Sequence, residues 1–314
     1  MSERILHNDY RRIALGDKVD KVLGLSSEAY KRWPLASKLI AQQIETKKRM
    51  VEIVNHSQLP YAGEIAEAGV RTSNKMQQLW VTQLYMQYYQ SNFVLSRQLI
   101  MHVIDNNAML KKVLKGSAEQ ATAIAMKIDK AFFDMLNDYD DTTQVYGDAL
   151  TIGSTAQLAG DGSTYSNLAA ASADVTLTAI EDARNVVSAW VDAGGKAIMP
   201  KLKALVANPA LYFDAQRILE SDLEPSNDLN AKNIVKSQKI LPGGLIESPH
   251  FSNDGSFMLL TDVEEGFMTF KHPQGLIFDE RPMPDRSWDV EMAALAACVH
   301  GIGDKRAVYI YPRD

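Results

Sequence analysis

The sequence predicts an α+β fold in which most helices precede most strands. Three observations carry this prediction: a helical period over residues 104–138, a second over residues 173–194, and strand-like segments from residue 230 onward. With 314 residues, of which 46% are hydrophobic and 23% charged, the chain is long enough for one large domain or two ordinary ones. This composition excludes a globally disordered protein.

The segment before residue 57 combines helical periodicity with positive charge. Apolar residues recur at three- and four-residue steps after Pro34, which predicts a helix within residues 27–54. Residues 1–56 contain 11 Lys and Arg but only 7 Asp and Glu. The remainder of the chain contains 22 Lys and Arg and 32 Asp and Glu, and the net charge of the whole chain is −6. Such a segment can face a polyanion or a neighbouring copy, and a solvated helix face stays open as the alternative.

Residues 57–79 contain Pro, Gly and scattered charges with weak periodicity, which indicates an exposed loop or a loosely held hairpin. The following stretch, residues 79–99, is rich in aromatic, Gln and Thr residues and predicts one long strand.

The two main helical segments have different boundaries. Residues 104–138 give the longest helical signal, and Gly116 is expected to divide or kink it. The Gly-, Ser-, Thr- and Ala-rich stretch 146–174 predicts a surface loop or an irregular hairpin. The second helix is expected to start at a cap formed by Ser172 or Asp174 and to stop at Gly194–Gly195.

Residues 202–221, LKALVANPALYFDAQRILES, predict a strand over 202–207, a cap at Asn208, Pro209 at the first helical position, and an amphipathic helix. Further strands are expected from residue 230, beginning with NIVKSQKIL (233–241). FKHPQG (270–275) is expected to form a turn between two of them.

Motifs that carry chemistry are scarce. The six His residues show no metal-ligand spacing, and the chain has no nucleophile elbow and no phosphate loop. Asp214 and Arg217, on an exposed helix side, are expected to form a surface ion pair. The single cysteine, Cys298, is expected to be a buried small hydrophobe. A Cys–His nucleophile with His300 is disfavoured on the expectation that the two side chains project to opposite faces of a strand.

The sequence therefore predicts no catalytic residue, no cofactor and no metal. No window approaches the roughly 18 apolar residues of a membrane span, and the N-terminus lacks the apolar core of a signal peptide. We expect no membrane contact.

Three stretches carry a resemblance to a known family: residues 96–114 (SRQLIMHVIDNNAMLKKVL), residues 204–221, and residues 256–282 (SFMLLTDVEEGFMTFKHPQGLIFDERP). In this order, after a basic arm and a long loop, they resemble the major capsid proteins of tailed double-stranded-DNA phages with the Hong Kong 97 fold. The subgroup they resemble includes the head subunit of Mu-like phages.

The resemblance implies a domain organisation for nearly the whole chain. Its parts would be an N-terminal arm (1–56), an E-loop (57–94), a peripheral domain with a long spine helix (95–172), an axial domain (173–255), and late strands shared between the two domains (256–314). Contacts with an adjacent subunit would come from the E-loop residues Glu64, Glu67, Arg71, Lys75 and Trp80. Contacts with a neighbour or with DNA would come from the arm residues Arg11, Arg12, Lys47, Lys48 and Arg49.

The implied function is self-assembly, as hexamers and pentamers, into an icosahedral head that encloses the DNA genome. The subunit would assemble in the host cytoplasm and reside in the virion. Its partners would be other copies, a separate scaffolding protein, a portal, a candidate cement protein, and packaged DNA held without sequence specificity. One alternative is an encapsulin-type cellular shell of the same fold. The other is a soluble α+β enzyme, which predicts a pocket that gathers Asp214, Arg217, His272 or His300.

Overall fold

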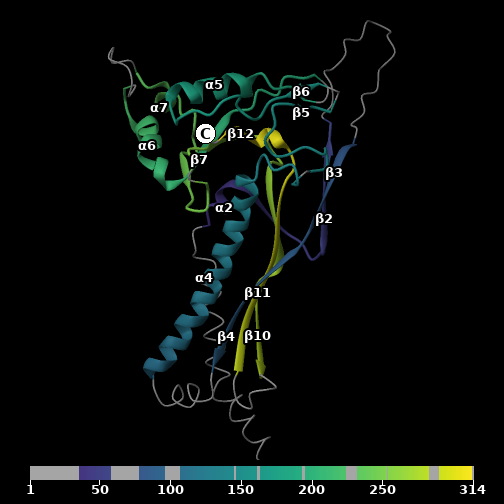
Figure 1. The fold of residues 1–314 in the computed structure, drawn as a ribbon, viewed down its shortest axis with the longest axis vertical. Coiled ribbons are helices and arrows are strands. Elements are labelled where there is room, and N and C mark those ends of the chain that lie inside the picture. The colour runs from purple at the N-terminus through teal and green to yellow at the C-terminus, as the bar shows by residue number, and fades with distance from the viewer. Residues whose placement is uncertain are drawn as a thin grey trace, which may run out of the picture.

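The computed structural model describes residues 35–57, 78–95, 107–144, 146–160, 163–192, 195–223, 232–252, 254–282 and 290–312. These residues form two four-stranded sheets, two smaller strand pairs and the helices around them (Figure 1). The elements divide into an upper layer, a lower layer and a ribbon along one side.

The upper layer in Figure 1 is built on one sheet with strands in the order β12 (Val308–Tyr311), β9 (Phe257–Thr261), β7 (Leu202–Ala207) and β8 (Leu245–Glu247). Both faces of this sheet are buried. Leu205, Phe257 and Tyr309 face a core shared with α5 (Leu177–Ser188) and α6 (Tyr212–Glu220). Val206 and Met258, their neighbours in sequence, face a second core on the other side. Because successive strand residues point to opposite faces, strands covered on both sides read as continuous apolar runs.

The lower layer contains the second sheet, in the order β1 (Gln42–Glu45), β10 (Phe267–Pro282), β11 (Val290–Ile302) and β4 (Gln87–Leu95). Helix α4 (Asn107–Asn137) runs along one face of it (Figure 1). Ile124 and Ile128 of the helix pack on Ala294, Ala296 and Cys298 of β11. The small side chains on the strand let the helix approach the sheet closely.

The C-terminal end of α4 joins the two layers. Phe132, Phe133 and Leu136 are fully buried in a core that takes Phe267 from the lower sheet and Ile310 from the upper sheet. The Phe132 and Phe267 rings meet edge to face, with centroids 5.8 Å apart. This helix end therefore fixes the position of one sheet relative to the other.

A two-stranded ribbon, β2 (Met50–His56) paired antiparallel with β3 (Gln78–Tyr85), runs along the right side of Figure 1. Val51 and Ile53 on its inner face are buried against Phe270 and Val299 of the lower sheet. The base of the ribbon is thus part of the core of the chain.

The predictions for residues 104–138 and 202–221 are confirmed. Within the first segment, helix α4 runs without a break from Asn107 to Asn137, so the division expected at Gly116 is wrong. The cost of one glycine in a helix, about 1 kcal/mol, is smaller than the gain from packing the apolar stripe. In the second segment the Asn208 side chain accepts a hydrogen bond from the Ala210 amide at 3.0 Å. Pro209 then begins a short turn, η1 (Pro209–Leu211), that leads into α6.

The helix expected within residues 27–54 is wrong in the part that the structure describes, which starts at residue 35. Only α2 (Ser37–Ile40) is helical there, and β1 and β2 follow it. In β2, Val51 and Ile53 are buried and alternate with the exposed Met50 and Glu52. This two-residue period and the β-branched side chains favour a strand, although the apolar spacing also fits a helix.

The expectation of a single long strand over residues 79–99 is wrong. In the described part, which ends at residue 95, the segment forms two strands. Strand β3 pairs with β2, and β4 pairs with β11 in the lower sheet. Met86 lies between them, buried in the core under the ribbon, and its amide donates to the Arg49 carbonyl at 3.0 Å. The chain changes sheets where this one side chain turns inward.

Two of the expected β features are also wrong. The segment 233–241 contains a short helix, α7 (Ile234–Ser237), because the Asn233 side chain caps it and also donates to two carbonyls at the end of α6. Residues 270–275 lie inside β10 rather than in a turn. A register shift between Lys271 and Leu276, with Gly275 at φ 63°, places the extra residues in a bulge.

The boundaries of α5 differ from both expectations. Its cap is Thr176, whose hydroxyl oxygen accepts from the Ala179 amide at 3.2 Å, rather than Ser172 or Asp174. The helix ends at Ser188, before Gly194, because Trp190 turns into the core and donates its indole N–H to the Ser166 carbonyl.

The stretch 146–174 is largely irregular, with one small pair of strands, β5 (Gln157–Leu158) and β6 (Thr164–Tyr165). It is not only a surface loop, because Gln157 and Asn167 are fully buried. Both side-chain amides donate to the Ile152 carbonyl at 2.8 Å. These hydrogen bonds give a partner to a backbone carbonyl that an irregular buried segment would otherwise leave unsatisfied.

His300 on β11 is held at both ring nitrogens. Its Nε2 lies 3.1 Å from the Ile128 carbonyl of α4, and its Nδ1 lies 3.0 Å from the Thr269 hydroxyl of β10. A carbonyl only accepts, so Nε2 carries the proton and the hydroxyl donates to Nδ1. Burial lowers the pKa of His300 to about 4, which keeps this ring neutral.

Cys298 is buried, as expected, and burial raises the pKa of its thiol to about 12. The expectation that it points away from His300 is wrong, since residues two apart on a strand share a face. Its Sγ lies 3.9 Å from His300 Nε2. The pair packs between sheet and helix, and its high thiol pKa disfavours a thiolate nucleophile.

We expect the free energy of unfolding to fall as the pH is lowered from about 6.5 to about 4, because the unfolded chain binds a proton at His300 before the folded chain does. The loss from this group is on the order of 3 kcal/mol. Urea unfolding between pH 4 and 7 measures it. His300→Gln should remove this part of the pH dependence, whereas His272→Gln, at a half-buried position in the bulge of β10, should retain it. Equal pH slopes for wild type and His300→Gln would contradict the assignment.

Candidate assembly surfaces

Four of the ten residues expected to contact other molecules lie in the part of the chain that the structure describes. Lys47, Lys48 and Arg49 are exposed in the turn between β1 and β2, and Trp80 is half-buried on β3. The turn is anchored by two hydrogen bonds from backbone amides, one from Lys48 to the Thr46 side-chain Oγ1 and one from Met86 to the Arg49 carbonyl. Outside the described residues lie Arg11, Arg12, Glu64, Glu67, Arg71 and Lys75.

The ribbon meets the rest of the chain through close backbone contacts. The Gly147 amide donates to Thr82 Oγ1 at 3.0 Å, and a Cβ at Gly147 would lie 2.6 Å from the Val81 carbonyl oxygen. Only glycine fits this approach. On the other strand, Asn55 Nδ2 donates to the Gly303 carbonyl at 2.9 Å. Both strands of the ribbon are therefore held near its base.

A buried ion pair supports this contact. Lys305 Nζ lies 2.6 Å and 2.8 Å from the two Asp148 carboxylate oxygens and also donates to the Leu150 carbonyl. The side chains are only 6% and 2% exposed. Burial lowers the pKa of Lys305, and its hydrogen bond to Asp148 opposes that shift. Since Asp148 follows Gly147, the pair holds the loop on which β3 rests.

The next residue, Arg306, ties the same region to the upper layer. Its guanidinium lies 4.5 Å from the Tyr165 ring centroid, donates to the Val191 carbonyl at 2.9 Å and contacts Asp304 at 3.3 Å. Lys305 and Arg306 belong to the short helix η2 (Lys305–Ala307), so one turn of chain holds the ribbon and the upper layer together.

A cavity of about 590 Å³ opens between the ribbon and the upper layer. One wall contains Trp80 and His56 of the ribbon, and the other contains Met199. Carboxylates gather on the cavity lining, from Asp148, Asp262, Glu264, Glu265 and Asp304. Met199 is 66% exposed and has φ 51°, a backbone conformation that a bulky side chain rarely adopts.

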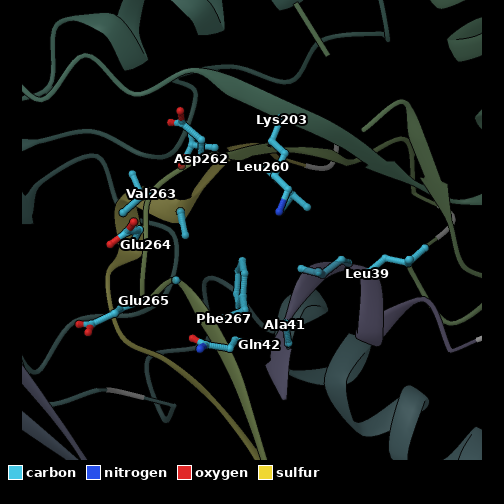
Figure 2. A pocket seen from close by; sticks show the side chains of 14 residues that line it. Leu39, Ala41, Gln42, Lys203, Leu260, Asp262, Val263, Glu264, Glu265 and Phe267 are labelled. Atoms are coloured by element: carbon cyan, nitrogen blue, oxygen red, sulfur yellow. The ribbon is translucent and has the colours of Figure 1, made fainter. Parts of the chain in front are cut away.

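A second cavity, of about 350 Å³, lies between residues 39–42 and residues 260–267 (Figure 2). Phe267 and Ala41 lie on its lower side in the view, and Glu264 and Glu265 lie at its left side. The two cavities share the segment 262–265. This acidic segment therefore borders both.

The residues considered for an enzyme site are not brought together. Asp214 and Arg217 form the expected surface pair at 3.3 Å on α6 in the upper layer. His272 is half-buried in the bulge of β10, and His300 lies on β11, where its ring contacts the Ile128 carbonyl of α4. Neither cavity described above is lined by any of the four.

The arrangement around Lys305 and Asp148 was not identified from the sequence. The two residues are 157 positions apart, and a lone lysine and a lone aspartate carry no spacing signal. Within the described ranges, no helix is long and apolar enough to cross a membrane.

The chain was compared with known proteins. A family model described as phage capsid protein matches residues 84–311, more than half of the chain. A search of curated proteins finds no match.

Solved structures share the fold. The chain is similar to a virus-like particle from Pyrococcus furiosus, with 10% identity and a TM-score of 0.56 over 93% of this chain and 98% of that chain. It is similar to the capsid of a native GTA particle, with 15% identity and a TM-score of 0.57 over 89% and 90%. It is also similar to a structure from Mycobacterium phage Adephagia, with 12% identity and a TM-score of 0.54 over 90% and 91%. At such identities the likeness concerns the fold.

We expect Lys305→Met to lower the free energy of unfolding by about 3 kcal/mol or more, because it leaves the Asp148 carboxylate buried without its partner. Urea denaturation of the full chain measures the change. The matched control is Lys130→Met, which removes an exposed pair with Asp134 on α4 and should cost about 0.5 kcal/mol or less. If both variants lose the same stability, the ion pair does not support the ribbon contact as described.

Proposed function

The chain belongs to the phage capsid protein family and is a major capsid protein, and we propose that it self-assembles as hexamers and pentamers into an icosahedral head around double-stranded DNA. The match of the family model over residues 84–311 is the observation that carries this proposal. Its α+β architecture is the predicted capsid fold of the Hong Kong 97 type. Self-association into capsomers and a place in the virion capsid follow from the family.

We assign the parts of this fold to the elements described above. Helix α4 would be the spine helix, the lower layer the peripheral domain, and the upper layer the axial domain. The E-loop would be the β2–β3 ribbon with the residues that connect its strands. Because β2 begins at Met50, this proposal moves the start of the E-loop from residue 57 to residue 50.

A structural role without catalysis agrees best with the scattered polar residues. Asp214, Arg217, His272 and His300 lie on an exposed helix, in a strand bulge and under α4, which offers no shared site for a reaction. A cellular shell of the encapsulin type has less support, because the matching family model describes phage capsid proteins.

The proposed partners beyond other copies are a scaffolding protein, a portal, a candidate cement protein and the packaged DNA, with assembly in the host cytoplasm. Among the described cations, Lys47, Lys48 and Arg49 are exposed together on one turn. Cations on such a turn would contact phosphates without sequence specificity, and the contact would weaken as salt rises.

The test is electron microscopy and sedimentation of the expressed chain, alone and with any co-encoded scaffold. We expect rings, sheets or shells, because a capsid subunit buries large surfaces only with other copies. A second sample replaces residues 58–77 by an Asn-Gly turn between β2 and β3, whose last paired residues are His56 and Gln78. This variant should keep its fold and melting temperature but fail to assemble.

Two outcomes would contradict the proposal. One is a wild-type chain that stays a compact monomer under every condition. The other is a loss of folding on removal of residues 58–77, since that would place this segment in the subunit's own core.

A further inference from the structure

We propose that Phe213 and Arg217 on α6 of one copy dock into the cavity between the ribbon and the upper layer of the next copy. This inference rests on the proposed function and deepens it, because it names two surfaces that would join successive copies in a capsomer.

The first surface is the outer side of α6. Phe213 is 72% exposed, the largest exposed fraction among the large apolar side chains that the structure describes. The inner side of the helix is buried through Ala215 and Ile218. Full burial of a phenylalanine side chain is favourable by about 1.5–3 kcal/mol of transfer free energy. A phenylalanine left this exposed in the subunit therefore indicates a contact outside it.

Arg217 lies one turn along the same outer side. Its side chain is 73% exposed, and one of its nitrogens contacts Asp214 at 3.3 Å. A guanidinium has five N–H donors, so this contact leaves donors for a second carboxylate. An aromatic side chain beside an arginine is a combination that often dominates the energy of an interface.

The second surface is the cavity of about 590 Å³ beside the ribbon. Trp80 lines it on the ribbon side, and Met199 and Val263 line it on the other side, so it offers apolar walls to a phenylalanine ring. Met199 is held outward, 66% exposed, on a backbone with φ 51°. A bulky residue in this region stores strain of about 1–3 kcal/mol, which is typical of binding positions.

The charges of the two surfaces are complementary. Asp262, Glu264 and Glu265 are exposed at the cavity. Lys305 and Arg306 also line the cavity, and they are already paired with Asp148 and Asp304. The exposed carboxylates therefore give the cavity a negative rim for Arg217 of the next copy.

The positions of the surfaces suit a ring. Helix α6 lies at the left edge of the upper layer in Figure 1, whereas the cavity lies beside β3, at the right edge. A closed ring of identical copies needs a head-to-tail contact between two different patches of the same chain. The outer side of α6 and the cavity beside the ribbon are two such patches on opposite sides of one subunit.

The first experiment measures the concentration of protein at half-assembly. Phe213→Ala and Arg217→Glu should each raise it at least about tenfold, with unchanged melting of the subunit because both side chains are exposed. Met126→Ala, a change at a 39% exposed apolar residue of α4, is the matched control and should assemble like wild type. Combining Arg217→Glu with Glu264→Lys should restore part of the loss.

The second experiment uses disulfide formation, for which the only native cysteine, Cys298, is buried. In assembled protein treated with oxidised glutathione, Phe213→Cys combined with Met199→Cys should give a ladder of covalent oligomers on a non-reducing gel. A mixture of the two single variants should give dimers at most, because each chain then holds one new thiol.

Particles that form normally with Phe213→Ala and show no ladder would overturn this contact and leave the proposed function standing. A wild-type chain that forms no assembly at all would instead overturn the proposed function.

Discussion

The architecture depends on the burial of the C-terminal end of α4 between the two sheets. Phe132, Phe133 and Leu136 are fully buried and take partners from both layers. Truncating a side chain of this kind in a core costs about 2–5 kcal/mol, so three together represent much of the stability of an ordinary domain. The Phe132 ring also meets the edge of His300, whose Nε2 donates to the carbonyl of the same helix. Hydrophobic packing and a satisfied polar contact therefore fix one helix end against the lower sheet.

The ribbon and its surroundings follow from that arrangement. With β10 and β11 fixed under α4, Phe270 and Val299 present an apolar face on which Val51 and Ile53 pack. Lys305 and Arg306, shortly after β11, then bind the loop at Asp148 and the upper layer at Val191. Exposed apolar side chains remain at the periphery, among them Phe213, Met199 and Tyr85. A subunit with a well-packed interior and apolar groups at its edges is suited to associate with copies of itself, which agrees with membership of a capsid family.

Elements governed by local physics could be predicted from the sequence, and elements governed by distant partners could not. The stripe that ends in Phe132 and Leu136 and the Asn208–Pro209 start signal identified α4 and α6 because their causes lie within a few residues. The apolar residues of β2 fit a helix as well as a strand, and pairing with β3 decides between the two. The break at Met86 depends on a core residue turning inward between two sheets. The Lys305–Asp148 pair joins residues 157 positions apart, so no short window of sequence contains it. The phage capsid family was recognised from the order of the segments, whereas the cavity beside Trp80 required the structure.

The central claim is that a well-packed body presents its ribbon and the outer side of α6 to other copies. Hydrogen–deuterium exchange of the free subunit and of the assembled particle tests it most directly, because amide protection reports local burial and opening. The account predicts that assembly slows exchange in β2, in β3 and around Phe213, while exchange in β9 and β12, already buried on both faces, stays the same. Unchanged exchange in the ribbon and in α6, with new protection elsewhere, would contradict it.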